Sequence, residues 1–203
     1  MQFRPLLWPT LFALPALLVL LWLGTWQVQR LEWKNQLIED FESRATAAPV
    51  DLPSGDVGPE MEFRRLALTG SYDHDREVFM TGRTYEGNAG FHIVTPFTLT
   101  DGRTVLINRG WVSESYREQD KREFTLVEGE VTVAAILRFP GKRGYFVPEN
   151  EPENGFWFTL VPEQIVSHLG LQGKAETAIY AAALRTSDTC LLYTSDAADE
   201  QWS

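Results

Sequence analysis

The sequence predicts a membrane-anchored protein. An N-terminal transmembrane α-helix precedes an extramembrane domain of mainly antiparallel β structure, a small sheet or barrel of the α+β class. Three observations predict this fold. No residue between Arg4 and Arg30 carries a charged side chain. Beyond that segment, short β-branched and aromatic runs alternate with turn-forming Asp, Gly and Pro. Only one later stretch, 162–169, reads as a helix, so the domain is expected to be built on strands.

The apolar segment has the length of a membrane span. From Leu6 to Trp26 the residues are mostly Leu, Ala, Val, Phe and Trp. At about 1.5 Å rise per residue they cover roughly 30 Å, the thickness of a hydrocarbon core. Pro9 and Pro15 are tolerated in membrane helices. A cleaved signal peptide is the alternative, but it needs small residues directly after a short apolar core, and the bulky Trp26 stands there instead. We therefore predict an uncleaved anchor.

The same helix is predicted to extend beyond the bilayer, so that residues 1–45 form the anchor and its extension. Leu31, Leu37, Ile38 and Phe41 keep a helical spacing among charged residues. Pro49 should lie past the end of the helix, because proline interrupts helical hydrogen bonding.

One face of this helix carries aromatic and cationic side chains. Trp22, Trp26, Arg30 and Lys34 recur every four residues, as is typical of an aromatic belt with cations at the lipid headgroups. Trp26, Arg30 and Lys34, together with Trp33, are therefore predicted to contact the membrane or a partner, and ligand packing is the alternative for the Trp residues. The numbers of Lys and Arg on the two sides do not decide the orientation.

A linker over 46–61 and a β-rich domain over 62–186 are predicted after the anchor. The linker is rich in Pro, Gly, Asp and Ser and has no periodicity. The clearest element of the domain is a hairpin of strands 91–99 and 103–108 around Asp101-Gly102, since Gly accepts the positive φ of a tight turn. The other expected elements are a hairpin of 63–72 and 76–80 around Asp73-His74-Asp75, strands 131–139, 156–160 and 178–184, and a helix over 162–169 that stops at Gly170.

Residues 187–203 are interpreted as an artefactual tail. The tail lacks core periodicity, and the run from Cys190 to Glu200 resembles the translation of sequencing-adapter DNA. Cys190 is the only Cys of the sequence, which excludes a disulfide framework within one chain.

Composition and motifs argue against several functions. The net charge of −10 and the lack of clustered Lys and Arg make a nucleic-acid partner unexpected. The three His residues have no Cys or carboxylate at ligand spacing, so no metal site is predicted. Nucleophile elbows, phosphate-binding Gly loops and zinc-helix motifs are missing from the sequence, so no catalytic residue is predicted.

Each His has a simple structural explanation. His74 is assigned to turn chemistry, because adjacent Asp and His side chains on a turn seldom face one another. His92 alternates onto the strand face opposite Phe91 and Ile93 and is predicted to be a surface or groove residue. His168 falls in the last turn of the short helix, where a cation favours the helix dipole.

The segment Asn108-Arg109-Gly110-Trp111 is the most specific candidate for a site. An amide, a guanidinium, a flexible Gly and a large ring at a strand end could form a polar notch beside an aromatic wall. The equal alternative is that Arg109 pairs with a carboxylate while Gly110 makes a bulge against which Trp111 packs.

Several ordered segments resemble the surfeit locus 1 family, and the resemblance covers roughly 21–171. The segments are Leu23-Gly24-Thr25-Trp26-Gln27 with Arg30, Trp33 and Lys34; Phe91-His92-Ile93-Val94-Thr95-Pro96-Phe97; Asp101-Gly102-Arg103; Asn108-Arg109-Gly110-Trp111-Val112; and Pro148-Glu149-Asn150. The resemblance implies two spanning helices that flank one domain on the periplasmic or intermembrane-space side. It also implies a role in assembly of cytochrome c oxidase through haem a handling for subunit I.

The sequence departs from this family pattern after Arg185. The family's second spanning helix, with the His segment associated with haem, has no counterpart there, so its haem ligand is missing from this chain. We interpret the chain as a truncated reading frame joined to foreign sequence. His92 matches a family motif that is not the haem ligand, and it is assigned only a structural or contact role.

The sequence hypothesis is therefore a non-enzymatic assembly factor in a bacterial inner membrane, with a cytoplasmic N-terminus and a periplasmic domain. Its expected partners are lipid, cytochrome c oxidase subunit I and other assembly factors. Arg109 and Trp111 are predicted to face a partner or a propionate of haem a, since guanidinium and carboxylate pair well. The alternative is a membrane-tethered β-domain ligand binder or hydrolase.

Overall fold

A computed structural model describes residues 7–173 and 175–184 of the chain. The chain divides into two compact units, one that ends at Arg44 and one that begins at Ala45. The predicted tail over 187–203 lies outside the described residues.

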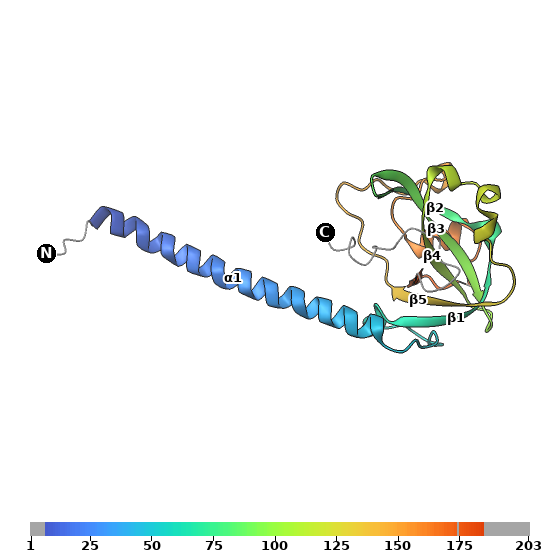
Figure 1. Ribbon diagram of the computed structural model, residues 1–203, viewed down its shortest axis with the longest axis horizontal. Helices are drawn as coiled ribbons and strands as arrows, with labels where there is room; N and C mark the ends of the chain where they lie inside the picture. Colours follow the sequence, from blue (N-terminus) through green and yellow to red (C-terminus); the bar gives the residue numbers. More distant parts are fainter. Residues whose placement is uncertain (1–6, 174, 185–203) are drawn as a thin grey trace. The chain divides into compact units, whose positions relative to one another are not determined.

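The first unit is a single long helix, α1 (Leu7–Thr46), drawn in blue in Figure 1. It is long and apolar enough to cross a membrane, and no side chain of its apolar stretch is buried by other parts of the chain. The helix continues through Pro15 and ends before Pro49, as the sequence predicts. The predicted combination of an N-terminal membrane helix and a mainly antiparallel β domain is therefore confirmed.

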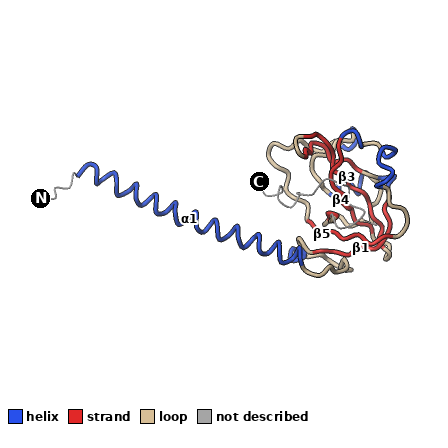
Figure 2. The backbone as a smooth tube through the Cα atoms, viewed as in Figure 1, coloured by secondary structure: helices blue, strands red, loops and turns tan. Residues whose placement is uncertain are grey.

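The second unit is built on a six-stranded sheet, coloured by structure in Figure 2. Its order is β1-β5-β6-β4-β3-β2, and every pair of neighbours is antiparallel except β4 and β6. The strands are β1 (Arg65–Tyr72), β2 (Val78–Tyr85), β3 (Asn88–Leu99), β4 (Thr104–Ser113), β5 (Val131–Arg138) and β6 (Tyr180–Ala183).

Strand β1 closes the sheet into a barrel because it pairs with β5 along most of its length and with β3 at its end. Five strands thus form a closed ring, and β2 extends the sheet beside β3. Closure brings the backbones very close at Gly70, where an added Cβ would stand 2.0 Å from the carbonyl oxygen of Thr98. Only glycine fits this crossing without a backbone shift.

Two apolar clusters lie on opposite faces of the sheet. The interior cluster combines alternate residues of five strands, among them Leu66, Phe97, Ile107, Leu137 and Ala181. The outer cluster covers β2, β3 and β4 with Trp157 and the short helix α2 (Pro162–His168). The alternation follows from the period of two in a strand, which sends neighbouring side chains to opposite faces.

Most predicted elements are confirmed. Strands β3 and β4 form the expected hairpin, in which Asp101 Oδ1 accepts the backbone N–H of Arg103 at 2.9 Å and Gly102 has φ of 86°. Strands β5 and β6 and helix α2 lie where the sequence predicts them. The loop 46–61 lies against the barrel, since Val50 pairs with Leu66 and Leu52 is buried.

Two predictions about strands are wrong. Strands β1 and β2 do not pair, because a 3-10 helix (His74–Arg76), held by a 2.9 Å ion pair between Asp73 and Arg76, redirects the chain. Residues 156–160 contribute only isolated bridges. The side-chain oxygen of Asn150 accepts the backbone N–H groups of Phe158 and Thr159, which a neighbouring strand would otherwise use.

Substitution of Gly70 by Ala should loosen the closure of the barrel. The new Cβ would overlap backbone that has no room to move aside, and we expect the free energy of unfolding to fall by roughly 2 kcal/mol. Chemical denaturation of the detergent-solubilised protein, followed by near-UV circular dichroism, measures this change. Ser71→Ala, at the exposed next position, is the control and should shift stability by less than about 0.5 kcal/mol. Equal stability of the two variants would contradict the closure argument.

Candidate functional site

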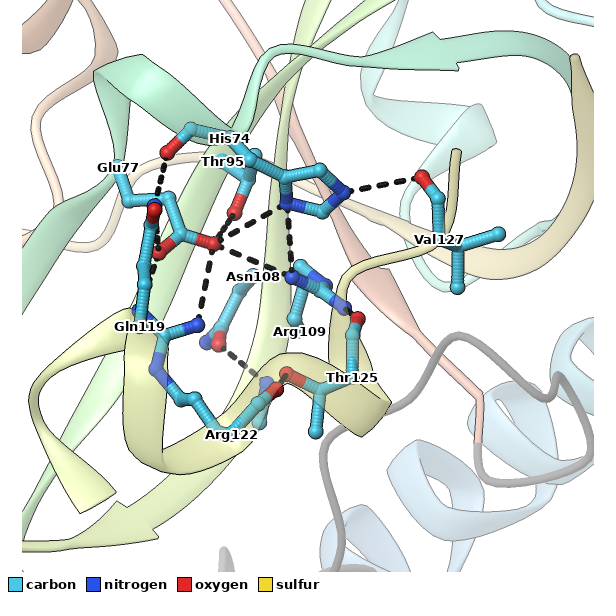
Figure 3. Close-up of polar contacts among 10 residues, drawn as sticks. His74, Glu77, Thr95, Asn108, Arg109, Gln119, Arg122, Thr125 and Val127 are labelled. Atoms are coloured by element: carbon cyan, nitrogen blue, oxygen red, sulfur yellow. Dashed lines mark hydrogen bonds and ion pairs between the residues drawn. The ribbon is translucent and has the colours of Figure 1, made fainter. Parts of the chain in front are cut away.

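A buried ionic network lies at the end of the barrel where β1 finishes, and Figure 3 shows its members. The carboxylate of Glu77 accepts hydrogen bonds from Arg109 Nη1 at 3.2 Å and from Arg122 Nη2 at 2.5 Å. All three side chains are at most 2% exposed. Two guanidinium groups thus share one carboxylate in the interior, where an unpaired charge would be very costly.

Neutral donors and acceptors complete the network. Thr95 donates its hydroxyl to Glu77 Oε1 at 3.2 Å, and Gln119 donates to Oε2 at 3.3 Å. The Nε2 atom of His74 lies 3.0 Å from the carbonyl oxygen of Val127 and must be the donor there. Its Nδ1 atom faces Arg109 Nη1 at 3.3 Å and Glu77 Oε1 at 3.4 Å. A neutral ring therefore accepts from Arg109, and a protonated ring would donate to Glu77.

The surroundings of Glu77 favour its ionised form. Burial alone would raise the pKa of Glu77, but hydrogen bonds from His74, Arg122 and Gln119, with the charge of Arg122, outweigh burial and lower this pKa to about 2. Burial lowers the pKa of Arg109, whose guanidinium lies 4.8 Å from the ring centre of Tyr72. A carboxylate with so low a pKa is a poor general base at neutral pH, so the network is suited to holding structure.

Local backbone geometry directs Arg109 into this network. In the β3–β4 ladder, Asn108 pairs with Val94 and Gly110 pairs with Ile93, so Arg109 is the extra residue of a β-bulge. Gly110 has φ of 110°, which only glycine adopts without strain. The carbonyl oxygen of Thr125 accepts a further hydrogen bond from Arg109 Nη2.

A 3-10 helical segment (Gln119–Thr125) supplies the other half of the network. It contributes the side chains of Gln119 and Arg122 and the carbonyl of Thr125. Because Glu77 precedes β2 and Arg109 lies in β4, the network fastens this segment to two strands of the sheet at once.

The structure gives the two predicted cofactor contacts different surroundings. Arg109 forms an ion pair with the carboxylate of Glu77. This pairing with a carboxylate is the alternative that the segment 108–111 predicted. Trp111 packs against Tyr85, with ring centres 5.5 Å apart, and is 6% exposed. Because the Arg109 guanidinium already serves Glu77, His74 and Thr125, haem contact there would require the network to open. The predicted haem contact by Arg109 and Trp111 stays a prediction.

His92 lies on the outer face of the barrel. Its Nδ1 atom lies 3.2 Å from Asn108 Nδ2, and it pairs across the ladder with Trp111 and Met80. Burial, and secondarily the charge of Arg83, lower the pKa of His92 to about 4. His92 is therefore neutral at physiological pH.

The predicted membrane contacts lie in α1. Trp26 and Trp33 are 45% and 52% exposed, and the guanidinium of Arg30 lies 5.0 Å from the ring centre of Trp33. Their contact with lipid or a partner, like that of Lys34, stays a prediction. Among the described residues, 7–173 and 175–184, no group of three or more His, Cys, Asp or Glu could hold a metal ion.

Sequence reasoning missed most members of the network. His74 was assigned to a turn, and Glu77, Gln119 and Arg122 were not singled out. The contacts of Glu77 reach 32 residues along the chain to Arg109 and 45 residues to Arg122. A pattern among neighbouring residues cannot reveal a pairing between residues so far apart in the chain. The one available signal is the Arg-Gly pair at 109–110, which indicates a bulge with a buried guanidinium.

The fold and the network together define a membrane-anchored β-barrel protein with a buried network of ion pairs and hydrogen bonds at one end of the barrel. A family model described as the SURF1 family matches residues 14–198. The chain therefore belongs to the SURF1 family, as its sequence motifs indicate.

Several curated proteins are similar to this chain. Surfeit locus protein 1 of Homo sapiens is 40% identical over 152 residues, which are 66% of this chain and 51% of that protein. The protein named cytochrome oxidase assembly protein SHY1 in Saccharomyces cerevisiae is 36% identical over 156 residues, 72% of this chain and 40% of that protein. The chain spans about half the length of the curated relatives it matches.

Replacement of Glu77 by Gln should destabilise the domain strongly. Arg109 and Arg122 would remain buried without their counter-charge, and we expect a loss of about 3 to 5 kcal/mol in the free energy of unfolding. Denaturant unfolding at pH 7 gives the value. Asp73→Asn, which breaks the more exposed pair with Arg76, is the matched control and should cost less than about 1 kcal/mol. Similar losses in both variants would show that the network does not hold the fold.

The low pKa of His92 predicts an acid-sensitive stability. The folded-state pKa is about 4 and the ordinary value is 6.5, so the unfolded chain binds the proton first as pH falls. Stability is fully present above pH 6.5 and should decline by roughly 3 kcal/mol at most between pH 6.5 and 4. Denaturant unfolding measured between pH 6.5 and 4 should show a smaller decline in the free energy of unfolding for His92→Gln than for the parent protein. An identical slope for the two proteins would refute the assignment to His92.

Proposed function

We propose that this chain is a non-enzymatic assembly factor of cytochrome c oxidase. One observation carries the proposal: the chain belongs to the SURF1 family, in which the similar Saccharomyces cerevisiae protein is named a cytochrome oxidase assembly protein. Its oxidase partners would be subunit I and other assembly factors. The buried network supports this role, since its carboxylate is saturated with donors and is better suited to holding a contact surface than to catalysis.

We further propose that α1 anchors the chain in a bacterial inner membrane, with the N-terminus in the cytoplasm and the domain in the periplasm. The length and apolar composition of α1 support a spanning position. Trp26, Arg30, Trp33 and Lys34 follow the apolar stretch and would meet the lipid headgroups.

The finer proposal is that the chain assists the handling of haem a. Haem a would supply the redox-active iron of the oxidase. The motifs shared with the surfeit locus 1 family support this step.

Deletion of the gene in its host tests the assembly role. Membranes of the deletion strain should lose most of their assembled oxidase, and expression of the intact chain should restore it. Blue-native electrophoresis with detection of subunit I measures assembly. A chain that lacks residues 7–26 but still accumulates is the control for anchoring, and it should fail to restore assembly. Normal oxidase levels in the deletion strain would refute the proposal.

The haem a step is tested separately in the same membranes. If the chain handles haem a, extractable haem a should persist in the deletion strain while the remaining subunit I lacks it. Normal haem content per subunit I would restrict the role to scaffolding. Arg109→Ala, provided that the protein accumulates, tests the residue itself, and an unchanged haem content in the oxidase would exclude Arg109.

A further inference from the structure

An exposed aromatic pair marks the loop that follows β5 (Figure 1). The loop covers residues 139–151 and joins β5 to a 3-10 helix (Pro152–Asn154). Tyr145 and Phe146 are 96% and 94% exposed, and no large apolar side chain among the described residues is more exposed. Their ring centres lie 5.1 Å apart in an edge-to-face arrangement. We call Tyr145 and Phe146 the aromatic tip.

The aromatic tip stands on a hydrogen-bonded turn. The backbone N–H of Val147 donates to the carbonyl oxygen of Gly144 at 3.1 Å, so the two aromatic residues are the central residues of the turn. The carbonyl oxygen of Val147 accepts from Arg143 Nη1 at 3.4 Å. These backbone groups are paired within the loop, which lowers the cost of moving the tip into an apolar phase.

The exposure of the tip is unusual for a residue pair of this kind. Single exposed apolar side chains are ordinary on protein surfaces. Two adjacent aromatic rings are different, because each could bury a large apolar area by contact with another surface. A turn that presents both rings to solvent therefore indicates a contact made with something outside the barrel.

The loop around the tip is basic. Lys142 and Arg143 precede the tip, and no Asp or Glu occurs between residues 139 and 148. Both cations are exposed, although Arg143 also pairs with Glu149 at 3.3 Å. Aromatic rings beside cations suit the surface of an anionic bilayer, where rings enter at headgroup level and cations meet phosphates.

The loop leaves the barrel beside the point where the chain enters it. The entering chain meets the start of β1, where Val50 bridges to Leu66 and donates its backbone N–H to Arg65 at 3.0 Å. The end of β5 meets the same start of β1, since the backbone N–H of Leu137 donates to the carbonyl oxygen of Arg64 at 2.9 Å. The ionic network lies where β1 finishes. The loop thus starts at the end of the barrel that is nearest to α1 along the chain.

The anchor favours a bilayer over a protein pocket as the partner of the tip. As proposed, α1 would hold the domain beside lipid at a high effective concentration. An upright extension over 27–46 would separate the barrel from the lipid by roughly 30 Å, at about 1.5 Å per residue. However, Leu31, Leu37 and Ile38 of this extension are exposed, and they favour a helix that leans onto the headgroups over one that stands in water.

We propose that the aromatic tip inserts into the headgroup region of the bilayer and is a second membrane contact in addition to α1. The rings of Tyr145 and Phe146 lie among the glycerol and upper acyl groups, and Lys142 and Arg143 pair with lipid phosphates. This inference rests on the proposed anchoring by α1 and is independent of the oxidase and haem a roles.

Fluorescence quenching in the full chain tests this contact. Cys190→Ser removes the only natural thiol, and the dye NBD is attached at Gly141→Cys, a loop position with open space around its Cβ. The protein is placed in nanodiscs of phosphatidylcholine and phosphatidylglycerol, with or without lipid that carries a nitroxide on its acyl chain. We expect the nitroxide lipid to remove a large part of the NBD fluorescence with no oxidase present.

Two other label positions separate the tip from the anchor. A label at Leu14→Cys, in the apolar stretch of α1, should be strongly quenched. A label at Tyr116→Cys should not be quenched, because the 3-10 helix Glu114–Tyr116 packs beside the network segment 119–125. Quenching at Leu14 without quenching at Gly141 would overturn the tip contact alone, and no quenching at either position would overturn the anchoring as well.

Matched variants show whether the rings make the contact. In the protein labelled at Gly141→Cys, the double variant Tyr145→Ser with Phe146→Ser should lose most of the quenching. The control, Tyr116→Ser with Phe156→Ser, also removes two exposed rings and should be quenched as the parent is. Equal quenching in the two double variants would overturn the proposal.

A role of the rings in folding predicts a different result. If Tyr145 and Phe146 held the loop against the barrel, their double variant would melt well below the parent. Because both rings are almost fully exposed, we expect the two proteins to have the same melting temperature in detergent. A large fall in the melting temperature of the variant would also overturn the proposal.

Discussion

The carboxylate of Glu77, held between the buried guanidiniums of Arg109 and Arg122, is the interaction on which the domain depends most. It connects the entry of β2, the bulge of β4 and the 3-10 segment 119–125, three pieces of chain that share no strand pairing at that point. Each ion in such a site is tolerable only while its partners remain, because desolvation is already complete. The network therefore couples closure of one barrel end to the presence of a single carboxylate.

The network accommodates its two buried guanidiniums in different ways. The charge and donors of Arg109 are matched by Glu77, His74 and the Thr125 carbonyl. Arg122 donates to both oxygens of Glu77 through its Nη atoms, while its Nε atom is buried with no hydrogen-bond partner among the described residues. Pairing with Glu77 therefore neutralises the charge of Arg122 without filling all of its hydrogen-bonding capacity.

Membership of the SURF1 family unites these features with the apolar helix α1. The proposed assembly role needs a surface with a fixed shape at the membrane, and it does not require a reactive group. The ring of five strands leaves β2 as an edge strand, and that edge is partly covered where the backbone N–H of Thr81 donates to the carbonyl oxygen of Trp157. Recognition in that role would then rest with outward-facing side chains.

The sequence by itself determined the features that depend on near neighbours. The uncharged run defined α1, and Asp101-Gly102 defined the β3–β4 hairpin, because helix length, strand alternation and turn geometry are local properties. The Arg109–Gly110 pair offered a bulge with a buried ion pair as one of two interpretations. Only the tertiary structure decided that β1 pairs with β3 and β5, that Asn150 replaces a strand at 156–160, and that Glu77 is the partner of Arg109. These contacts join residues far apart in the chain, and their energy comes from burial and desolvation, which no short stretch of sequence reports.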